Sequence, residues 1–182
     1  MFTTIYLPDF YLQAALRHQA ELLFKPVGLI DDQEKKAAIV QLNRIAQENG
    51  VRIGMTPSQG LARTLELVIK VRSRGQEKNL QDVLLHFAAT LSPYVEATGP
   101  GLATVEFTDV KNVAAKVTQV VDELARAEIA ARAGIAPTPD ASFLAAHLAE
   151  PVLQVEDASK FLAALPIDVL AIFSNGRASA RP

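Results

Sequence analysis

The sequence predicts an α+β fold built from two long amphipathic helices and several short β-rich segments. Apolar residues recur at helical spacing over residues 76–91 and again over residues 110–128. Four β-rich segments accompany these helices, at residues 3–7, 94–98, 103–108 and 128–136. When residues 8–75 are set aside, the order is strand, helix, strand, strand, helix, strand. This is the ferredoxin-like βαββαβ order, in which two helices cover one face of an antiparallel sheet.

The composition is that of an ordinary soluble domain. The chain has 182 residues, of which 49% are hydrophobic and 21% charged, enough for one domain or for one domain with an insertion. It contains no cysteine, which excludes disulfides and thiolate metal sites. Its N-terminus lacks the pattern of a secretion signal, and no apolar run approaches the ~20 residues of a membrane span. We therefore expect a cytoplasmic protein without membrane contact.

The charge balance argues against tight DNA binding by this chain alone. Its net charge is −2, whereas proteins that hold duplex DNA use Lys and Arg to neutralise phosphates. Basic residues form only small groups, namely Lys70 with Arg72 and Arg74, and Lys35 with Lys36. We expect these groups to lie on solvated faces.

The first part of the chain is expected to alternate strands and short helices. The β-rich residues 3–7 begin it. Helical character follows over residues 10–18, with Asp9 in place to cap the helix N-terminus. Two apolar segments and the charged turn that joins them predict a pair of strands, at residues 26–31 and 37–42 with the turn at 32–35.

Glycine and proline mark the next elements. Residues 43–49 can form a short helix that Gly50 ends. Thr56-Pro57 predicts an N-cap followed by proline at the first helical position, so a helix is expected from there to about residue 65. A strand is expected at residues 67–71.

Each long helix carries an apolar stripe, and a glycine-rich turn lies between the two helices. The first stripe comprises Leu80, Val83, Leu84, Phe87 and Leu91. The second comprises Val110, Val113, Ala114, Val117, Val121 and Leu124. Gly99-Pro100-Gly101 predicts the turn of a β-hairpin.

The C-terminal elements complete the expected domain organisation. A helix, a short strand and a last helix are expected at residues 140–148, 152–155 and 157–165. The chain is then divided into a palm-like domain, an insertion and a frayed tail. These parts comprise residues 1–7 with 76–173, residues 8–75, and residues 174–182.

Four stretches of the sequence resemble the Y-family (translesion) DNA polymerases. Residues 43–55 keep the frame of the family's fingers pattern, Asn-Tyr-x-Ala-Arg-x-x-Gly-Val-x-x-Gly-Met. Further similarity follows in the family's order, at residues 5–14, 91–96, and 134–136 with 145–151. Leu-Pro-Asp and Gly-Ile-Ala-Pro-Thr-Pro look most like the ImuB-type, polymerase-like subunits of bacterial mutagenesis complexes. The resemblance implies a palm with a small α/β fingers subdomain inserted after the first strand.

The resemblance also implies that the catalytic positions lack charge. Nucleotidyl transfer in this family requires two Mg²⁺ ions about 3.5–4 Å apart, held by carboxylates. Tyr6 stands where the first metal-binding Asp belongs, and Gly101 and Leu102 stand where the acidic pair of the hairpin belongs, or Pro100 and Gly101 if the turn is one residue longer. None of these side chains is ionised at pH 7. We therefore expect no bound metal and no cofactor.

The positions that contact the triphosphate in the family are changed as well. Arg44 replaces the Tyr, Gln47 replaces the Arg, and Glu150 replaces a Lys. An anion at that last position repels a phosphate by about 1 kcal/mol in water, and by more when desolvated. Tyr11, at the position of the aromatic residue that senses the sugar, is kept. We interpret these four residues as remnants of a nucleotide site.

Other candidate chemistry is weak. His18, His86 and His147 share no common spacing and have no Cys or carboxylate cluster around them, so we expect no zinc site.

Three hypotheses follow. The first is a catalytically inactive scaffold in DNA damage tolerance, which links a true polymerase to the replication clamp and to a recombinase-type protein. The second is an active nucleotidyltransferase that uses Mg²⁺ and Asp9 with Glu106 or Asp109. The third is an unrelated ferredoxin-like interaction domain. Because the family's thumb, little-finger and C-terminal partner-binding regions are missing, we expect a truncated product or a fragment.

Overall fold

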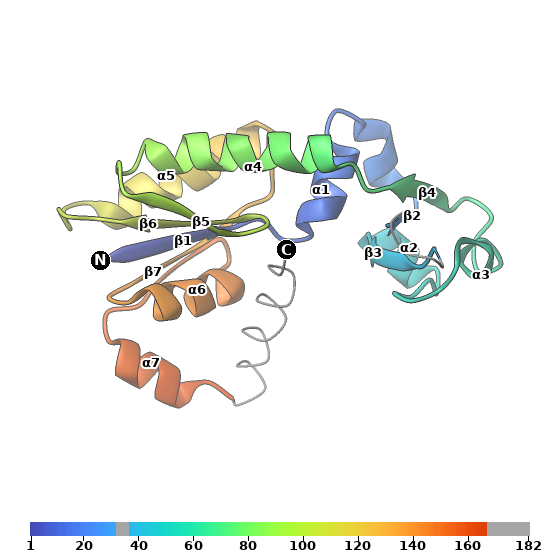
Figure 1. Ribbon diagram of the computed structural model, residues 1–182. Coiled ribbons are helices and arrows are strands. Elements are labelled where there is room, and N and C mark those ends of the chain that lie inside the picture. Colours follow the sequence, from blue (N-terminus) through green and yellow to red (C-terminus); the bar gives the residue numbers. More distant parts are fainter. Residues whose placement is uncertain (32–36, 167–182) are drawn as a thin grey trace. The chain divides into compact units, whose positions relative to one another are not determined.

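The computed structural model describes residues 1–31 and 37–166, and the chain folds as two compact units (Figure 1). The large unit consists of Met1–Pro8 and the chain from Gln81 onward, and the small unit is Asp9–Leu80. The predicted turn at residues 32–35, the Lys35–Lys36 pair and the predicted tail at residues 174–182 lie outside the described residues.

A five-stranded sheet forms the centre of the large unit. Its order is β5-β6-β1-β7-β8, with the first strand in the middle. The strands are β1 (Phe2–Tyr6), β5 (Val95–Gly99), β6 (Leu102–Glu106), β7 (Arg132–Ala136) and β8 (Val152–Gln154). β1 runs antiparallel to both neighbours, and its last residue, Tyr6, lies opposite Leu102 on one side and Arg132 on the other. The predicted α+β class and ferredoxin-like order are confirmed.

Helices cover both faces of this sheet. Figure 1 shows α4 (Arg74–Ala89) and α5 (Val113–Arg126) on one face, and α6 (Pro139–Leu148) and α7 (Ala158–Ala164) on the other. The predicted stripe of α5 is buried at Val113, Val117, Val121 and Leu124, together with Val120, which the prediction omitted. Val110 was wrongly included, because Asn112 adopts a left-handed conformation before the helix and leaves Val110 61% exposed.

The small unit is built on a three-stranded sheet. In its order β3-β2-β4, β2 (Val27–Ile30) pairs antiparallel with β3 (Ile39–Leu42) and parallel with β4 (Val68–Val71). Its helices are α1 (Phe10–Leu16), the 3-10 helix η1 (Ala20–Phe24), α2 (Arg44–Glu48) and α3 (Pro57–Leu61). The 3-10 helix η1 was not predicted, and both α1 and α3 are shorter than predicted.

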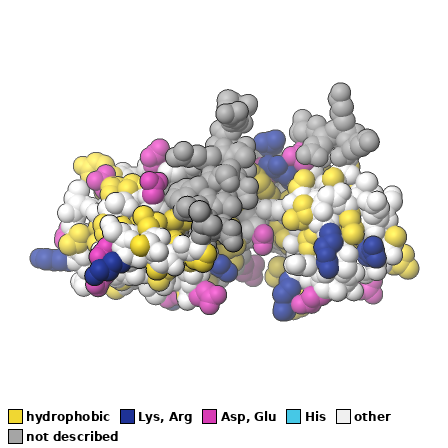
Figure 2. Space-filling view, turned by 90° about the horizontal axis from the view of Figure 1, so that it is seen from below, with side chains coloured by type: hydrophobic (Ala, Val, Ile, Leu, Met, Phe, Trp, Pro, Cys, Tyr) yellow, Lys and Arg dark blue, Asp and Glu magenta, His cyan; other side chains and the backbone are white. Residues whose placement is uncertain are grey.

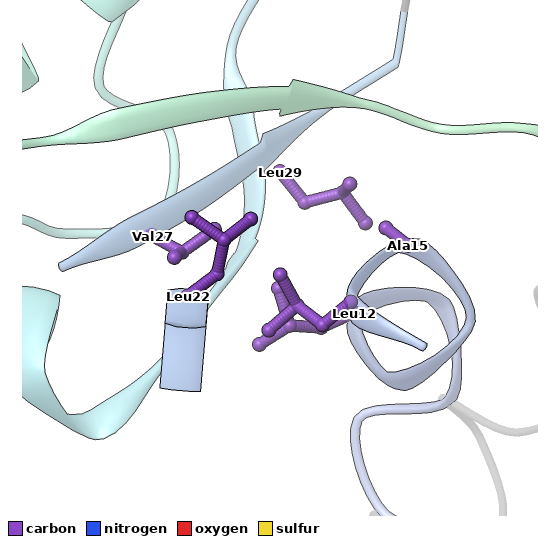
Figure 3. Packing of buried hydrophobic residues seen from close by; sticks show 6 residues of the cluster. Leu12, Ala15, Leu22, Val27 and Leu29 are labelled. Carbon is purple, nitrogen blue, oxygen red and sulfur yellow. The ribbon is translucent and has the colours of Figure 1, made fainter. Parts of the chain in front are cut away.

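Two apolar clusters hold the small unit together. One joins α1 and η1 to β2, and Figure 3 shows its side chains converging between these elements. It comprises Leu12, Ala15, Leu16, Leu22, Val27 and Leu29. The other comprises Ile39, Ala46, Val51 and Leu67. Each cluster lies between helix and sheet, so the unit has a core of its own.

Predicted caps fix the segment between β3 and β4. The side-chain oxygen of Asn43 accepts hydrogen bonds from the backbone nitrogens of Ala46 and Val27, each at 3.0 Å, which ties α2 to the neighbouring strand. Gly50 ends that helix with a φ of 83°, and Thr56 and Gln59 form a reciprocal capping box on α3. Gly50 confirms the predicted end of α2 and Thr56 confirms the predicted start of α3, whereas the capping role of Asn43 was not predicted.

Within the described residues, no helix combines the length and apolar character that crossing a bilayer requires.

Glycine allows α6 to lie directly on the central strands. A Cβ added at Gly134 of β7 would collide with backbone atoms of Ser142, Ala145 and Ala146. α6 packs against both β7 and β1, and the buried hydroxyl of Ser142 hydrogen-bonds to that of Thr4 at 2.8 Å. The backbone contact at Gly134 therefore sets the position of every α6 side chain that faces the sheet.

We predict that Gly134→Ala destabilises the protein by about 3 kcal/mol or more, because helix and strand must separate to admit the methyl group. Urea unfolding measures this change. Gly75→Ala is the matched control: its Cβ would meet only the Ser73 hydroxyl, at 4.0 Å, and alanine in α4 should raise stability by up to about 1 kcal/mol. Equal stability of Gly134→Ala and wild type would contradict the packing.

Candidate functional site

The end of β1 carries an aromatic stack where the resemblance implies a carboxylate. The ring of Tyr6 lies 4.1 Å from that of His147, centroid to centroid, with an interplanar angle of 21°. Tyr6 comes from the central strand, and His147 comes from the last turn of α6. The strand register gives Tyr6 the neighbours Leu102 and Arg132, and neither is acidic.

The imidazole of His147 is held in place from its own helix. Its Nδ1 lies 2.9 Å from the carbonyl oxygen of Phe143, and the two rings are 4.4 Å apart. Burial lowers the pKa of His147 and outweighs the opposing effect of the Phe143 carbonyl, while nearby Arg132 lowers the pKa further. The ring is therefore neutral at pH 7 and packs against the phenol as an uncharged aromatic group.

The hairpin turn beside Tyr6 is also uncharged. Gly101 adopts a left-handed φ of 69°, and its carbonyl accepts a hydrogen bond from Leu7 N at 2.8 Å. Gln81 of α4 clamps the turn, because its Oε1 accepts from Gly101 N at 2.8 Å and its Nε2 donates to the Leu102 carbonyl at 3.2 Å. A glycine, an amide and a leucine therefore occupy this part of the site.

The acidic residues of the alternative hypothesis lie away from Tyr6. Glu106 is paired with Phe2, at the opposite end of β1. Phe2 and Tyr6 are four residue steps apart along the strand, a distance of about 13 Å. Asp109 accepts a hydrogen bond from the backbone nitrogen of Lys111 at 3.0 Å in its own loop. Among residues 1–31 and 37–166, no group of three His, Cys, Asp or Glu could hold a metal ion.

Asp9 belongs to the small unit, and its predicted role is correct only in part. It occupies the N-cap position of α1, and its carbonyl accepts from Gln13 N at 2.9 Å. Its side chain makes no capping hydrogen bond, because the residue adopts a left-handed conformation with φ 49° rather than the extended one that capping requires.

A pocket of about 680 Å³ lies in the small unit. Two of the predicted nucleotide remnants, Arg44 and Gln47, line it, and the rest of its wall comes from Asp9, Leu42 and residues 51–53. Tyr11 and Glu150 are not among its lining residues. Glu150 lies exposed after α6 in the large unit.

Two arginines supply the positive charge of this pocket. Arg44 pairs with Glu48 at 3.5 Å, with both side chains largely exposed. Arg52 was not predicted to belong to a site. Its Nη1 donates to the carbonyls of Gln47 at 2.7 Å and Val51 at 2.8 Å, which satisfies acceptors at the C-terminal end of α2 and holds the guanidinium in one place.

Tyr11 is held in the small unit by a buried ion-pair cluster. The guanidinium of Arg72 lies 3.8 Å above its ring centroid. Arg72 also pairs with Asp31 at 2.8 Å and with Glu77 at 2.8 Å, and all three charged side chains are at most 14% exposed. The hydrogen bonds that Arg72 donates to the Glu77 carboxylate raise the pKa of Arg72. Arg72 thus joins the ends of β2 and β4 to α4 and α1.

This cluster corrects the prediction for the basic group around Arg72. Lys70, Arg72 and Arg74 were expected on solvated faces. Arg74 is exposed, but the Arg72 side chain is only 14% exposed, and Lys70 is half-buried and donates to Gln19 Oε1 at 2.6 Å. The acidic partners of Arg72 come from other elements, so the local sequence could not reveal them.

We predict that Arg72→Met lowers the free energy of unfolding by about 3–5 kcal/mol, because it leaves Asp31 and Glu77 buried without their shared cation. Chemical denaturation measures the loss. Arg44→Met removes an exposed pair and should change stability by no more than about 0.5 kcal/mol. Similar effects of the two substitutions would contradict a stabilising role for the ion pairs of Arg72.

The depressed pKa of His147 predicts a loss of stability in acid. The unfolded chain takes up a proton near the ordinary value of 6.5, whereas the folded chain does so only at lower pH. The free energy of unfolding therefore falls as the pH drops below 6.5, and this contribution is constant well above that value. Direct NMR titration of the imidazole tests the direction of the shift. In denaturation curves, the advantage of wild type over His147→Gln should shrink with acidification; an advantage that grows would contradict the assignment.

The family described as impB/mucB/samB (IMS) matches residues 5–147, which is more than half of the chain. DNA polymerase IV of Ralstonia nicotianae is 23% identical over 180 residues, covering 94% of this chain and 50% of that protein. The hypothesis of an unrelated ferredoxin-like domain is therefore wrong.

Solved structures agree in fold. A post-insertion binary complex of Dbh DNA polymerase superposes with a TM-score of 0.81 at 16% identity, over 92% of this chain and 52% of that one. DinB from Sulfolobus solfataricus superposes with a TM-score of 0.77 at 16% identity, over 98% of this chain and 57% of that one. The chain thus spans about half the length of the relatives it matches. It belongs to the impB/mucB/samB family of Y-family DNA polymerases and has the palm and fingers fold of that family.

Proposed function

We propose that this chain is a catalytically inactive, ImuB-type relative of the Y-family polymerases that acts as a scaffold in DNA damage tolerance. The observation that carries the proposal is the end of β1, where the Tyr6 ring stacks on His147 and neither cross-strand neighbour is a carboxylate. A two-metal reaction requires carboxylates at such a point to hold the ions and offset their charge. A phenol beside a neutral imidazole offers neither.

The neighbours of Tyr6 support the same conclusion. Gly101 and Leu102 supply no charge, and Leu102 is only 7% exposed. Hydrated Mg²⁺ sheds water reluctantly, so an apolar side chain directly across the strand pair disfavours its entry. Restoring one carboxylate would leave the ring of His147 in place, so several substitutions separate this site from a metal centre.

The predicted triphosphate positions support the proposal independently. Gln47 is neutral and Glu150 is acidic, whereas nucleotide phosphates require positive or hydrogen-bond-donating partners. Arg44 provides a cation, but it is engaged with Glu48 on the surface of α2. Loss of metal ligands and loss of phosphate ligands together are expected of a polymerase fold that is no longer selected for catalysis.

The proposed role depends on protein partners rather than on a cofactor. These partners are a true polymerase, the replication clamp and a recombinase-type protein of a mutagenesis complex, in the cytoplasm. With a net charge of −2, the chain is proposed to bind DNA weakly by itself. Contacts with some partners can lie in parts of the relatives that this chain does not span.

The alternative, an active nucleotidyltransferase, requires Asp9 to work with Glu106 or Asp109. The strand register argues against Glu106, because this residue is paired with Phe2 rather than with Tyr6. Asp109 is exposed in a loop beyond the same end of β6. We therefore keep this reading only as the outcome that the next experiment can reveal.

Primer extension tests the proposal directly. With a labelled primer–template, four deoxynucleotides and Mg²⁺ or Mn²⁺, we predict no incorporation above the background without protein. DNA polymerase IV of Ralstonia nicotianae is the assay control. The segment of that polymerase that matches this chain is the length control, because it spans the same part of the relative.

Incorporation by this chain that Asp9→Asn abolishes would overturn the proposal in favour of the alternative. Incorporation unaffected by Asp9→Asn but lost in Tyr6→Phe would also overturn it, since it would assign chemistry to the phenol. Tyr6→Phe keeps the stacked ring and removes only the hydroxyl, so it isolates that chemistry from folding.

A further inference from the structure

The pocket of the small unit combines positive charge with an apolar wall. Leu42, Val51 and Ile53 form the apolar part, and Ile53 is 68% exposed although it is a large aliphatic residue. Arg44 and Arg52 lie on the same wall, with Asp9 as its one acidic residue. Its volume of about 680 Å³ falls among ordinary ligand sites, which span about 300–1,000 Å³.

The two arginines are suited to receive an external acceptor. The Arg44–Glu48 pair is an exposed i,i+4 contact, with side chains 85% and 58% exposed, and such pairs are weak enough for an incoming carboxylate to compete. Arg52 is pre-ordered by two carbonyls that both engage Nη1. A guanidinium has five N–H donors on three nitrogens, so ordering one end leaves donors for a ligand and reduces the entropy lost on binding.

The wall does not fit a nucleotide well. None of its seven lining residues is aromatic, so it offers no ring on which a base could stack. A single carboxylate beside an aliphatic side chain fits better, because the carboxylate can pair with a guanidinium while the aliphatic group covers Ile53.

Two exposed residues of the small unit lie outside the pocket wall. Figure 2 shows Lys and Arg side chains among hydrophobic ones on the visible face of this unit. Leu65 is more exposed than Ile53, at 90%, but it is not a lining residue of the pocket. Arg74 is exposed at the start of α4 and is likewise outside the pocket wall. These two residues serve as matched controls.

We propose that this pocket binds a segment of a protein partner in which an acidic residue lies next to a large aliphatic or aromatic one. The inference rests on the proposed scaffold function, since it assigns one partner contact to the fingers-like unit. The acidic side chain pairs with Arg44 and Arg52, and the apolar side chain packs on Leu42 and Ile53.

A random library of peptides displayed on phage, selected on the immobilised full chain, tests the proposal. Enriched peptides should share an acidic residue within two positions of a large apolar one. A synthetic peptide of the enriched sequence should shift the NMR signals of residues 44–53, and its affinity should fall as salt is raised.

Variants locate the binding. Arg44→Glu and Ile53→Ser, both at exposed side chains, should each weaken the selected peptide by about 10-fold or more. Arg74→Glu and Leu65→Ser make the same changes outside the pocket and should alter affinity by less than about 2-fold. Both pairs should keep the wild-type unfolding transition, which separates lost binding from lost folding.

Several outcomes would overturn the inference. They are enrichment of no peptide, enriched peptides without acidic residues, equal binding by all four variants, or Mg²⁺–dATP shifting the same signals and displacing the peptide. A failed selection together with absent primer extension removes this inference alone. DNA synthesis by the chain removes the proposed scaffold function, whatever the pocket binds.

Discussion

The direct contact of α6 with the central strands governs the chemistry of the large unit. Gly134 lets the helix backbone approach β7 without an intervening side chain, and this approach brings His147 onto the ring of Tyr6. Tyr6 has the apolar Leu102 on one side and the cationic Arg132 on the other, so the neighbouring strands offer it no carboxylate. The helix contact therefore fills this end of β1 with the rings of Tyr6 and His147.

The small unit organises its charges differently. In its cluster around Arg72, the charges pair with one another and the guanidinium lies over the ring of Tyr11. This cation therefore has a structural role. The arginines of the pocket are nearer to solvent and engage only weak or backbone partners. Arg72 therefore stabilises the small unit, whereas Arg44 and Arg52 can receive a ligand, although the three arginines look alike in the sequence.

Periodicity and turn chemistry predicted most of the fold, because these signals are local. Gly50, the Thr56-Pro57 pair and the stripe of α5 each act within one element, and each was recognised. The burial of Arg72 depends on Asp31, which lies 41 residues away, and the stack on Tyr6 depends on the distant His147. No pattern along the chain predicts such contacts. The helical pair Phe143 and His147 was the one available local signal, and it indicates only that the two side chains share a face.

The resemblance to a known family predicts a degenerate site at Tyr6, Gly101 and Leu102, and the strand register shows only that Leu102 lies beside Tyr6. Acidic side chains from distant parts of the chain could have replaced the carboxylates that the resemblance implies at Tyr6, Gly101 and Leu102. The described residues contain no such group of potential ligands, and Glu106 is paired at the far end of the strand. Acidic side chains from elsewhere in the described residues therefore do not build a metal site at Tyr6.

Manganese titration followed by NMR tests the central claim most directly, since a bound paramagnetic ion broadens the signals of nearby amides. A strand end without carboxylates predicts that the amides of Tyr6, Leu102 and Arg132 broaden no more than those beside exposed carboxylates such as Glu106. Saturable broadening centred on Tyr6, and reversed by excess Mg²⁺, would contradict the account, because it would show that this strand end still holds a divalent metal ion.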